Sequence, residues 1–131
     1  MISSGVFNYI NVLGKAADGA WARNTAIANN IANVDTPGYK RQDVSFEEQL
    51  RHALKASKYP SLDSKVAEAN LHLNRLNPRT YTDIPNWSYR MDKNNVDIDT
   101  ENVELASNQI KYNGITNSID SEFANLKLVI K

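Results

Sequence analysis

The sequence predicts a mainly α-helical protein, in which long N- and C-terminal helices pair as a coiled coil around a loop-rich insert. Apolar residues recur with a 4-3 spacing over residues 6–34, and the same spacing returns over residues 105–130. The pattern is lost between these two segments. We therefore expect residues 1–44 and 99–131 to form one discontinuous helical domain, and residues 45–98 to form an irregular middle region.

The N-terminal segment keeps its spacing for four heptads, which is long enough to predict one helix with a narrow apolar seam. Such a helix would be about 42 Å long at a rise of ~1.5 Å per residue. Gly14 and Gly19 lie inside it, and each costs about 1 kcal/mol of helix propensity relative to alanine. The predicted seam consists of Val6, Ile10, Leu13, Ala17, Ala20, Asn24, Ile27, Ile31 and Val34.

The C-terminal segment repeats the pattern and begins with signals of a helix start. Asp99 or Thr100 can cap the helix, and the acidic residues around them suit the positive end of its dipole. The predicted seam consists of Leu105, Gln109, Tyr112, Thr116, Ile119, Phe123, Leu126 and Ile130.

The two helices carry more apolar residues than one pair can bury. A pair of helices covers one stripe on each partner, so the remaining apolar side chains would stay exposed in a monomer. Exposed apolar surface of this extent usually marks a partner surface. The residues concerned are Phe7, Tyr9, Trp21, Val103, Ala106 and Ile110.

The middle region lacks a sustained period. Its first part, SFEEQLRHALKAS, predicts a short helix, with Ser45 and Glu48 at the spacing of a capping box. Residues 56–98 are predicted to be loop-rich, because few periodic apolar residues and several prolines follow Tyr59. The stretch WSYRM, residues 87–91, is compatible with a short strand and leaves a small hairpin as an option.

The first helix is predicted to end within the segment ANNIANVDTPGYKR, residues 28–41. Thr36 precedes a proline and is driven out of the α region, so the helix must end by about Asp35. Pro37 and Gly38 suit the centre of a type II turn, in which Gly38 takes a positive φ.

The same segment holds three asparagines, which are mediocre helix formers because their amides compete for backbone groups. Asn33 lies close enough to the helix end to cap it. Asn29 and Asn30 lie one turn further in, and two interpretations remain for them. They are either solvent-facing side chains or polar contacts between packed subunits.

Composition argues against several classes of function. At 131 residues the chain has the length of one domain, and its 15 basic and 15 acidic residues balance, which disfavours a protein that binds nucleic acid by neutralising phosphates. Cysteine is absent, and no apolar run is long enough to span a membrane. His52 and His72 have no further histidine or cysteine at metal spacing, so we expect solvated or packed side chains. We therefore expect no enzyme, cofactor or metal site.

The segment ANNIANVDTPGYKR resembles the signature of the rod and hook family of axial proteins of the bacterial flagellum. That signature is a long helix ending in S/N-N-I-A-N, a short variable step, and T-P-G-Y/F-K; every element is present in order. The C-terminal region, with N-x-V-D-x-D-x-E and N-x-I-K-Y, is similar to that of the proximal rod subunits of this family. The resemblance assigns to a signature turn the residues Asn30, Asn33, Asp35, Thr36, Pro37, Gly38 and Tyr39.

The resemblance implies a structural subunit of the proximal rod of the basal body, whose terminal helices pack with neighbours into a helical tube that transmits torque. It implies as partners the chain itself, other rod proteins, a basal-body ring or adaptor protein at the proximal end, and the flagellar type III export apparatus. Export would proceed without a cleaved signal peptide, in agreement with an N-terminus that lacks a basic region and a compact apolar core. The alternative is a soluble coiled-coil adaptor or export chaperone for another flagellar or secreted protein, which has no need of the T-P-G-Y turn.

Overall fold

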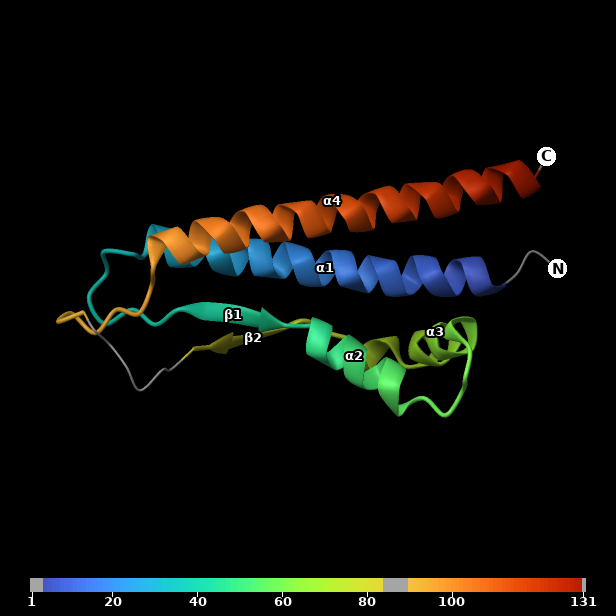
Figure 1. Cartoon of the computed structure of the whole chain (residues 1–131), viewed down its shortest axis with the longest axis horizontal. Coiled ribbons are helices and arrows are strands. Elements are labelled where there is room, and N and C mark those ends of the chain that lie inside the picture. Colours follow the sequence, from blue (N-terminus) through green and yellow to red (C-terminus); the bar gives the residue numbers. More distant parts are fainter. Residues whose placement is uncertain (1–3, 84–89, 131) are drawn as a thin grey trace.

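Two long antiparallel helices dominate the computed structural model, which describes residues 4–83 and 90–130 (Figure 1). The helices α1 (Ser4–Ala32) and α4 (Ile98–Val129) lie side by side, so that the N- and C-termini are at the same end of the molecule. This confirms the predicted fold class. The elements between them are β1 (Gln42–Ser45), α2 (Glu47–Ala56), α3 (Leu62–Leu71), the 3-10 helix η1 (Leu73–Arg75) and β2 (Arg79–Thr82).

The seam of α1 faces the interior along its whole length. Each of its nine predicted residues is buried or half-buried, with Ala20 and Ile27 buried. The seam of α4 is less regular, because two of the buried positions on this helix are polar, Glu101 and Asn108. Toward the free termini the packing between the helices loosens, and Phe123 remains 45% exposed.

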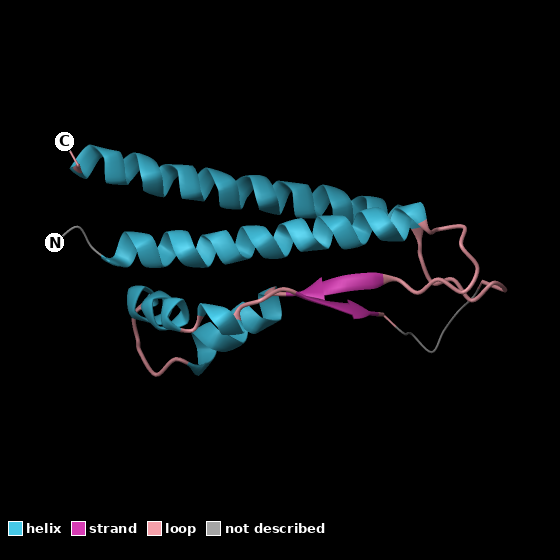
Figure 2. Ribbon diagram, turned by 180° about the vertical axis from the view of Figure 1, so that it is seen from behind, coloured by secondary structure: helices cyan, strands magenta, loops and turns pink. Residues whose placement is uncertain are grey.

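The opposite side of α1 is covered by the middle region, so the molecule has three layers (Figure 2). The short helices α2 and α3 pack beneath the N-terminal half of α1, and the two strands lie beneath its C-terminal half. Tyr9 also packs against this layer, which contradicts its predicted exposure. Phe7 and Trp21 are exposed, as predicted. The core of this layer is formed by Val12, Phe46, Val66, Ala69 and Leu76.

The strands β1 and β2 form an antiparallel pair, in which Val44 lies opposite Thr80. In the sequence, α2, α3 and η1 lie between the two strands. The strands are therefore joined by a long helical segment and not by a tight turn. Val44 is buried against α1, whereas the β2 residues are exposed. The strand considered for residues 87–91 lies mostly outside the described residues.

Three further predictions of local structure are wrong. The expectation of loops beyond Tyr59 fails for α3, which is capped by Ser61 through the backbone N–H of Ser64 at 3.2 Å. The capping box at the start of α2 is not formed, because Phe46 occupies the N-cap position and its side chain is buried in the core.

The third concerns the start of α4, where the cap is Asp97 rather than Asp99 or Thr100. The Oδ1 atom of Asp97 accepts hydrogen bonds from the backbone N–H of Asp99 at 3.0 Å and from that of Thr100 at 3.4 Å. The helix therefore begins slightly earlier than predicted, and Asp99 lies in its first turn.

Gly19 allows the close approach of Phe46 to α1. A Cβ built at this glycine would lie 2.7 Å from Cγ of Phe46 and 3.0 Å from its Cβ, whereas a Cβ at Gly14 would meet nothing within 4 Å. The part of the Phe46 side chain that is contacted lies close to its own backbone and cannot swing away. Gly19 weakens the helix, but the packing of Phe46 against α1 requires a residue without a Cβ at this position.

We predict opposite effects for the same substitution at these two glycines. Gly14→Ala should stabilise the protein by up to about 1 kcal/mol, because alanine is the better helix former. Gly19→Ala should destabilise it, because overpacking a core costs about 1–3 kcal/mol and offsets the helix gain. Urea unfolding of both variants measures the difference. A Gly19→Ala protein as stable as Gly14→Ala would contradict the packing role.

Candidate functional site

The turn after α1 is closed by its own backbone. The N–H of Tyr39 donates to the carbonyl of Thr36 at 3.2 Å, and Gly38 has a φ of 74°. These two features are those of a type II turn with Pro37 and Gly38 at its centre. The side chain of Asn33 completes the helix end, because its Nδ2 donates to the carbonyl of Asn29 at 2.8 Å.

The loop before α4 forms hydrogen bonds with this turn. Asn94 is buried, and its Nδ2 lies within 3.0 Å of three carbonyl oxygens, those of Asn33, Val34 and Thr36. The backbone N–H of Gly38 donates to the carbonyl of Asp92 at 2.7 Å. Carbonyl groups at the C-terminal end of a helix lack helical partners, and here a distant segment of the chain supplies donors.

Asn30 has no exposed surface, and its amide is used inside the chain. Its Nδ2 donates to the carbonyl of Gln42 at 2.8 Å and to Oε2 of Glu101 at 3.1 Å. Its Oδ1 accepts from the backbone N–H of Gln42 at 2.9 Å and from the Tyr39 hydroxyl at 3.1 Å. Asn30 therefore joins α1, β1, the turn and α4, while Asn29 is exposed.

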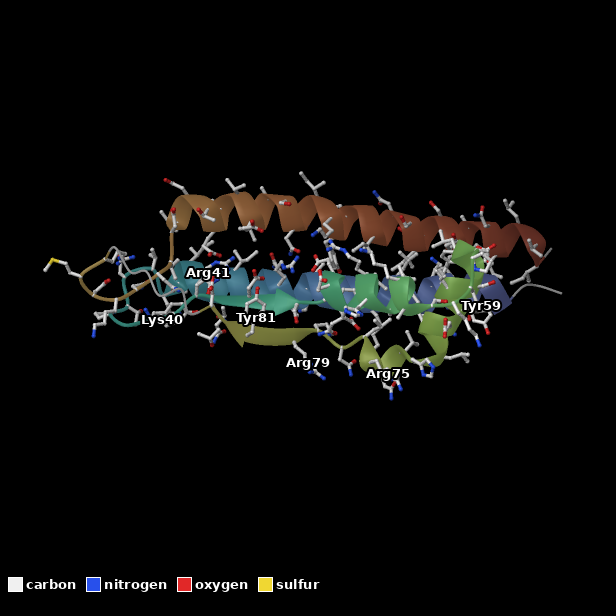
Figure 3. The ribbon with its side chains drawn as sticks, turned by 60° about the horizontal axis from the view of Figure 1, so that its bottom comes forward. Lys40, Arg41, Tyr59, Arg75, Arg79 and Tyr81 are labelled. Atoms are coloured by element: carbon white, nitrogen blue, oxygen red, sulfur yellow. The ribbon has the colours of Figure 1, made fainter. Side chains whose placement is uncertain are left out.

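The buried carboxylate of Glu101 is the centre of this polar network. It has no exposed surface, and its Oε1 is paired with Nε of Arg41 while its Oε2 accepts from Asn30. Figure 3 shows Arg41 at the end of the molecule where α1 and α4 meet. Burial and the negative charge of Glu101 both raise the pKa of the Tyr39 phenol. A carboxylate buried in this way is tolerated only with such partners.

A second ion cluster joins three helices further along the molecule. Arg23 of α1 pairs with both oxygens of Glu47 at the start of α2, with an Nη2–Oε2 distance of 2.7 Å, and lies 3.3 Å from Asp43. Lys111 of α4 donates to Oε1 of Glu47 at 2.8 Å. Burial alone would raise the pKa of Glu47, but the hydrogen bonds from Arg23 and Lys111 outweigh it and lower this pKa to about 2.

His52 and His72 are exposed and line a hollow of about 380 Å³ between α2 and α3. Within residues 4–83 and 90–130, no group of three or more histidine, cysteine, aspartate or glutamate side chains is placed to hold a metal ion. Among the described helices, none combines the length and the hydrophobicity that a membrane crossing requires.

Large apolar side chains remain exposed on both long helices. Some of these side chains lie at the end of the helix pair that holds the two chain termini. Others lie around Trp21 on α1, or on the side of α4 that faces away from α1. These residues are Phe7, Trp21, Val103, Ile110, Phe123, Leu128, Val129 and Ile130. The sequence predicts the exposure of Phe7, Trp21, Val103 and Ile110, whereas it places Phe123 and Ile130 in the seam. It does not reveal Asn94, Arg41 or Glu101, because their roles depend on partners distant in sequence.

Comparison with known proteins identifies relatives of the chain. A family described as "Flagella basal body rod protein" matches residues 11–40, which hold most of α1 and the turn. The flagellar basal body rod protein FlgB of Bacillus subtilis (strain 168) is 33% identical over 99% of this chain and 95% of its own length. FlgB of Borrelia hermsii is 37% identical over 83% of this chain and 85% of its own length, and FlgB of Escherichia coli (strain K12) is 26% identical over 83% of each.

Removing the buried carboxylate should be much more costly than removing an exposed one. Glu101→Ala removes the carboxylate that binds Arg41 Nε and Asn30 Nδ2 and leaves Arg41 with only the longer pairs to Asp43 at 3.4 Å and Asp83 at 3.6 Å, so we expect a loss of about 3 kcal/mol of unfolding free energy. Glu104→Ala is the matched control, because Glu104 is exposed on the same helix, and its effect should stay within about 0.5 kcal/mol. Urea unfolding measures both. Equal effects would mean that the network contributes no specific stability.

The depressed pKa of Glu47 predicts a pH-dependent contribution to stability. In the unfolded chain the carboxyl titrates near its ordinary value of 4.5, and in the folded chain near 2. Its contribution is therefore complete above pH 4.5 and is lost as the pH falls from 4.5 to about 2. The Glu47 side chain is 41% exposed, so solvent screening limits the size of the effect.

We expect Glu47→Gln to be less stable than the parent protein at neutral pH, with a difference that shrinks across this window. Urea midpoints of both proteins at several pH values measure it, and the other carboxylates cancel in the comparison. A difference that does not change with pH would rule out the ion cluster as its cause.

Proposed function

Because the chain belongs to the FlgB family of flagellar basal-body rod proteins, we propose that its terminal helices assemble with those of neighbouring subunits into the helical tube of the proximal rod. The chain is a structural subunit of the flagellar basal-body rod. We propose that residues 1–44 and 99–131 form the assembling domain, and that residues 45–98 form a separate middle region.

One observation supports assembly through the helices. The pair leaves its apolar residues incompletely covered at the free ends, where Phe7, Phe123 and Ile130 are exposed although the last two continue the seam. Burial of apolar surface contributes roughly 25 cal/mol per Å², so helices of neighbouring subunits would stabilise this end by covering it. The predicted seam residues then serve both the pair and the contacts between subunits.

The signature turn has a role in this proposal. A helical assembly repeats one contact many times, so a small angular error in each subunit accumulates along the tube. The network around Asn30, Asn94 and Glu101 holds the turn and the start of α4 in one arrangement. We therefore assign to the signature turn the task of fixing the direction in which the chain leaves α1.

The ion cluster suits the transmission of torque, which requires that subunits do not shear internally. Glu47 is bound by Arg23 from α1 and by Lys111 from α4, so it braces the two long helices through the start of α2. The proposal includes as partners the chain itself, other rod proteins and a ring or adaptor protein at the proximal end. It also includes passage through the flagellar export apparatus without cleavage of a leader.

We predict that Phe123→Asp prevents incorporation into the rod without preventing export. Phe123 is 45% exposed, so the chain can still fold, whereas a charge there would be buried unpaired between subunits. Tyr59→Asp is the matched control, because Tyr59 is 44% exposed but lies in the connection between α2 and α3 (Figure 3). Immunoblots of secreted fractions and of purified basal bodies, with swimming assays, measure the outcome.

The expected result is a Phe123→Asp protein that is secreted but missing from basal bodies, in cells that do not swim, and a Tyr59→Asp protein that is incorporated. Normal swimming with Phe123→Asp would refute assembly through the seam. A parent protein that stays in the cytoplasm and never enters basal bodies would favour the adaptor alternative.

A further inference from the structure

The strand β2 presents an open edge on the side of the molecule away from the long helices. β1 lies between β2 and α1, so one edge of β2 pairs with β1 and the other faces outward (Figures 1 and 2). All four residues of β2 are exposed. A strand edge of this kind carries backbone N–H and C=O groups that are able to pair with a strand of another chain.

The backbone hydrogen bonds of β1 show which residues of β2 face the open edge. Both backbone groups of Gln42 bind the amide of Asn30, at 2.9 Å for its N–H and 2.8 Å for its carbonyl, so Gln42 points away from β2. Residues directly opposite each other in an antiparallel pair either exchange both hydrogen bonds or exchange none. Thr82, which lies opposite Gln42, therefore directs its N–H and C=O away from β1.

Thr80 has the same orientation, because Val44 opposite it also points away from β2. The N–H of Val44 donates to Oδ1 of Asp43 at 2.7 Å, and its carbonyl accepts from Arg23 at 2.6 Å. Side chains thus close the outer edge of β1. The outer edge of β2 instead carries four backbone groups, the N–H and C=O of Thr80 and Thr82, that bond to no other described residue.

This open edge is complementary to itself. When two copies of β2 run antiparallel with Tyr81 opposite Tyr81, each Thr80 lies opposite the Thr82 of the other copy. The N–H and C=O groups of both threonines are then paired on both strands, while Tyr81 keeps its backbone groups directed to its own β1. Threonine and tyrosine are also residues that favour strands.

Charges favour the same register. Arg79 and Asp83 are equally distant from Tyr81 in sequence, so the two-fold pair places Arg79 of one copy opposite Asp83 of the other at both ends. Opposite charges and aromatic rings at facing positions both stabilise antiparallel strands. Arg79 is exposed on β2 and has no ion pair among the described residues (Figure 3). The side chain of Asp83 lies 3.6 Å from Arg41 and is still 43% exposed.

Other registers use the edge less completely. A shift of two residues in either direction leaves one threonine opposite its counterpart and places the other opposite residue 78 or 84, beyond the strand. Residue 78 is a proline, which has no N–H to donate. A shift of one residue sets Thr80 opposite Tyr81, whose backbone groups are already used by β1.

We infer that the free chain forms a two-fold dimer, in which β2 pairs antiparallel with β2 of a second copy and Tyr81 lies opposite Tyr81. The zero net charge leaves no overall repulsion between copies. Such a contact joins the same surface of both copies and closes on itself, whereas a helical tube repeats a contact between two different surfaces. The dimer is therefore a form of the protein outside the rod. It does not depend on the proposed function, because an adaptor would form the same dimer.

The absence of cysteine from the sequence allows a direct test by disulfide formation. Facing residues of antiparallel strands have Cα atoms about 4.5–5.5 Å apart, which suits a disulfide. Full-length Tyr81→Cys, oxidised with glutathione disulfide, should link to itself. Thr80→Cys and Thr82→Cys, carrying tags of different size, should link when mixed. Neither should link to itself, because two copies of either residue lie two positions out of register.

A second test leaves the centre of the strand unchanged. Sedimentation equilibrium of the parent chain should show a monomer–dimer equilibrium. Thr80→Pro removes an outward N–H without touching the ladder to β1, and it should weaken dimerisation about tenfold, because the two-fold symmetry removes the hydrogen bond twice. Thr80→Val keeps the N–H and is the control. Circular dichroism verifies that each variant keeps the helix content of the parent.

The charge pair has its own variant. Arg79→Glu places like charges opposite each other at both ends of the strand pair, so it should also weaken the dimer. Arg75→Glu is the matched control, because Arg75 is an exposed arginine four residues away that lies outside the strand. Its effect on the dimer should be small by comparison.

Three results would overturn the inference: a monomeric parent with Tyr81→Cys chains that do not link, Thr80→Cys chains that link to themselves as efficiently as to Thr82→Cys chains, or equal dimerisation of Thr80→Pro and Thr80→Val. In cells, the Thr80→Pro protein should still enter basal bodies. Its absence from them would assign the open edge to a contact within the rod, which would refute the free dimer while leaving the proposed function intact.

Discussion

The arrangement of the two long helices depends on one buried carboxylate. Glu101 is withdrawn from solvent at the start of α4, and its charge is acceptable only because Arg41 and Asn30 reach it from the segment around the turn. This requirement sets the register between the helices. A displacement of α4 that separated Glu101 from Arg41 and Asn30 would leave a charge unpaired in the interior, in addition to uncovering the apolar seam. The polar network thus supplies specificity, and the apolar seam supplies most of the attraction.

The sequence reveals the long helices and the turn because their signals are local. The 4-3 spacing of α1 can be read without knowledge of any partner, and the Thr36-Pro37-Gly38 sequence restricts its own backbone. The end of α1 and the positive φ of Gly38 follow from these signals, and the structure has both.

Other features are hidden because their causes lie elsewhere in the chain. Glu101 and Asn108 look like surface residues of a polar helix until Arg41, Asn30 and the carbonyl of Ala20 are brought next to them. The pattern of α3 is weak, because this helix buries only Val66 and Ala69 while Leu62 and Leu71 at its ends are exposed. Asn30 is ambiguous in the sequence for the same reason, and its partners place it inside the chain's own fold.

The paired strands have a consequence for how such a chain can change in length. β1 and β2 pair at the two ends of the segment that holds α2, α3 and η1, residues 46–78, so the chain enters and leaves this segment at one place. The connection from α2 to α3, residues 57–61, lies beyond the core of that region and is mostly exposed. Extra sequence inserted there would project outward, at a loop-closure cost that grows only slowly with length. The connection between α2 and α3 can therefore lengthen without changing the packing of α1 against α4.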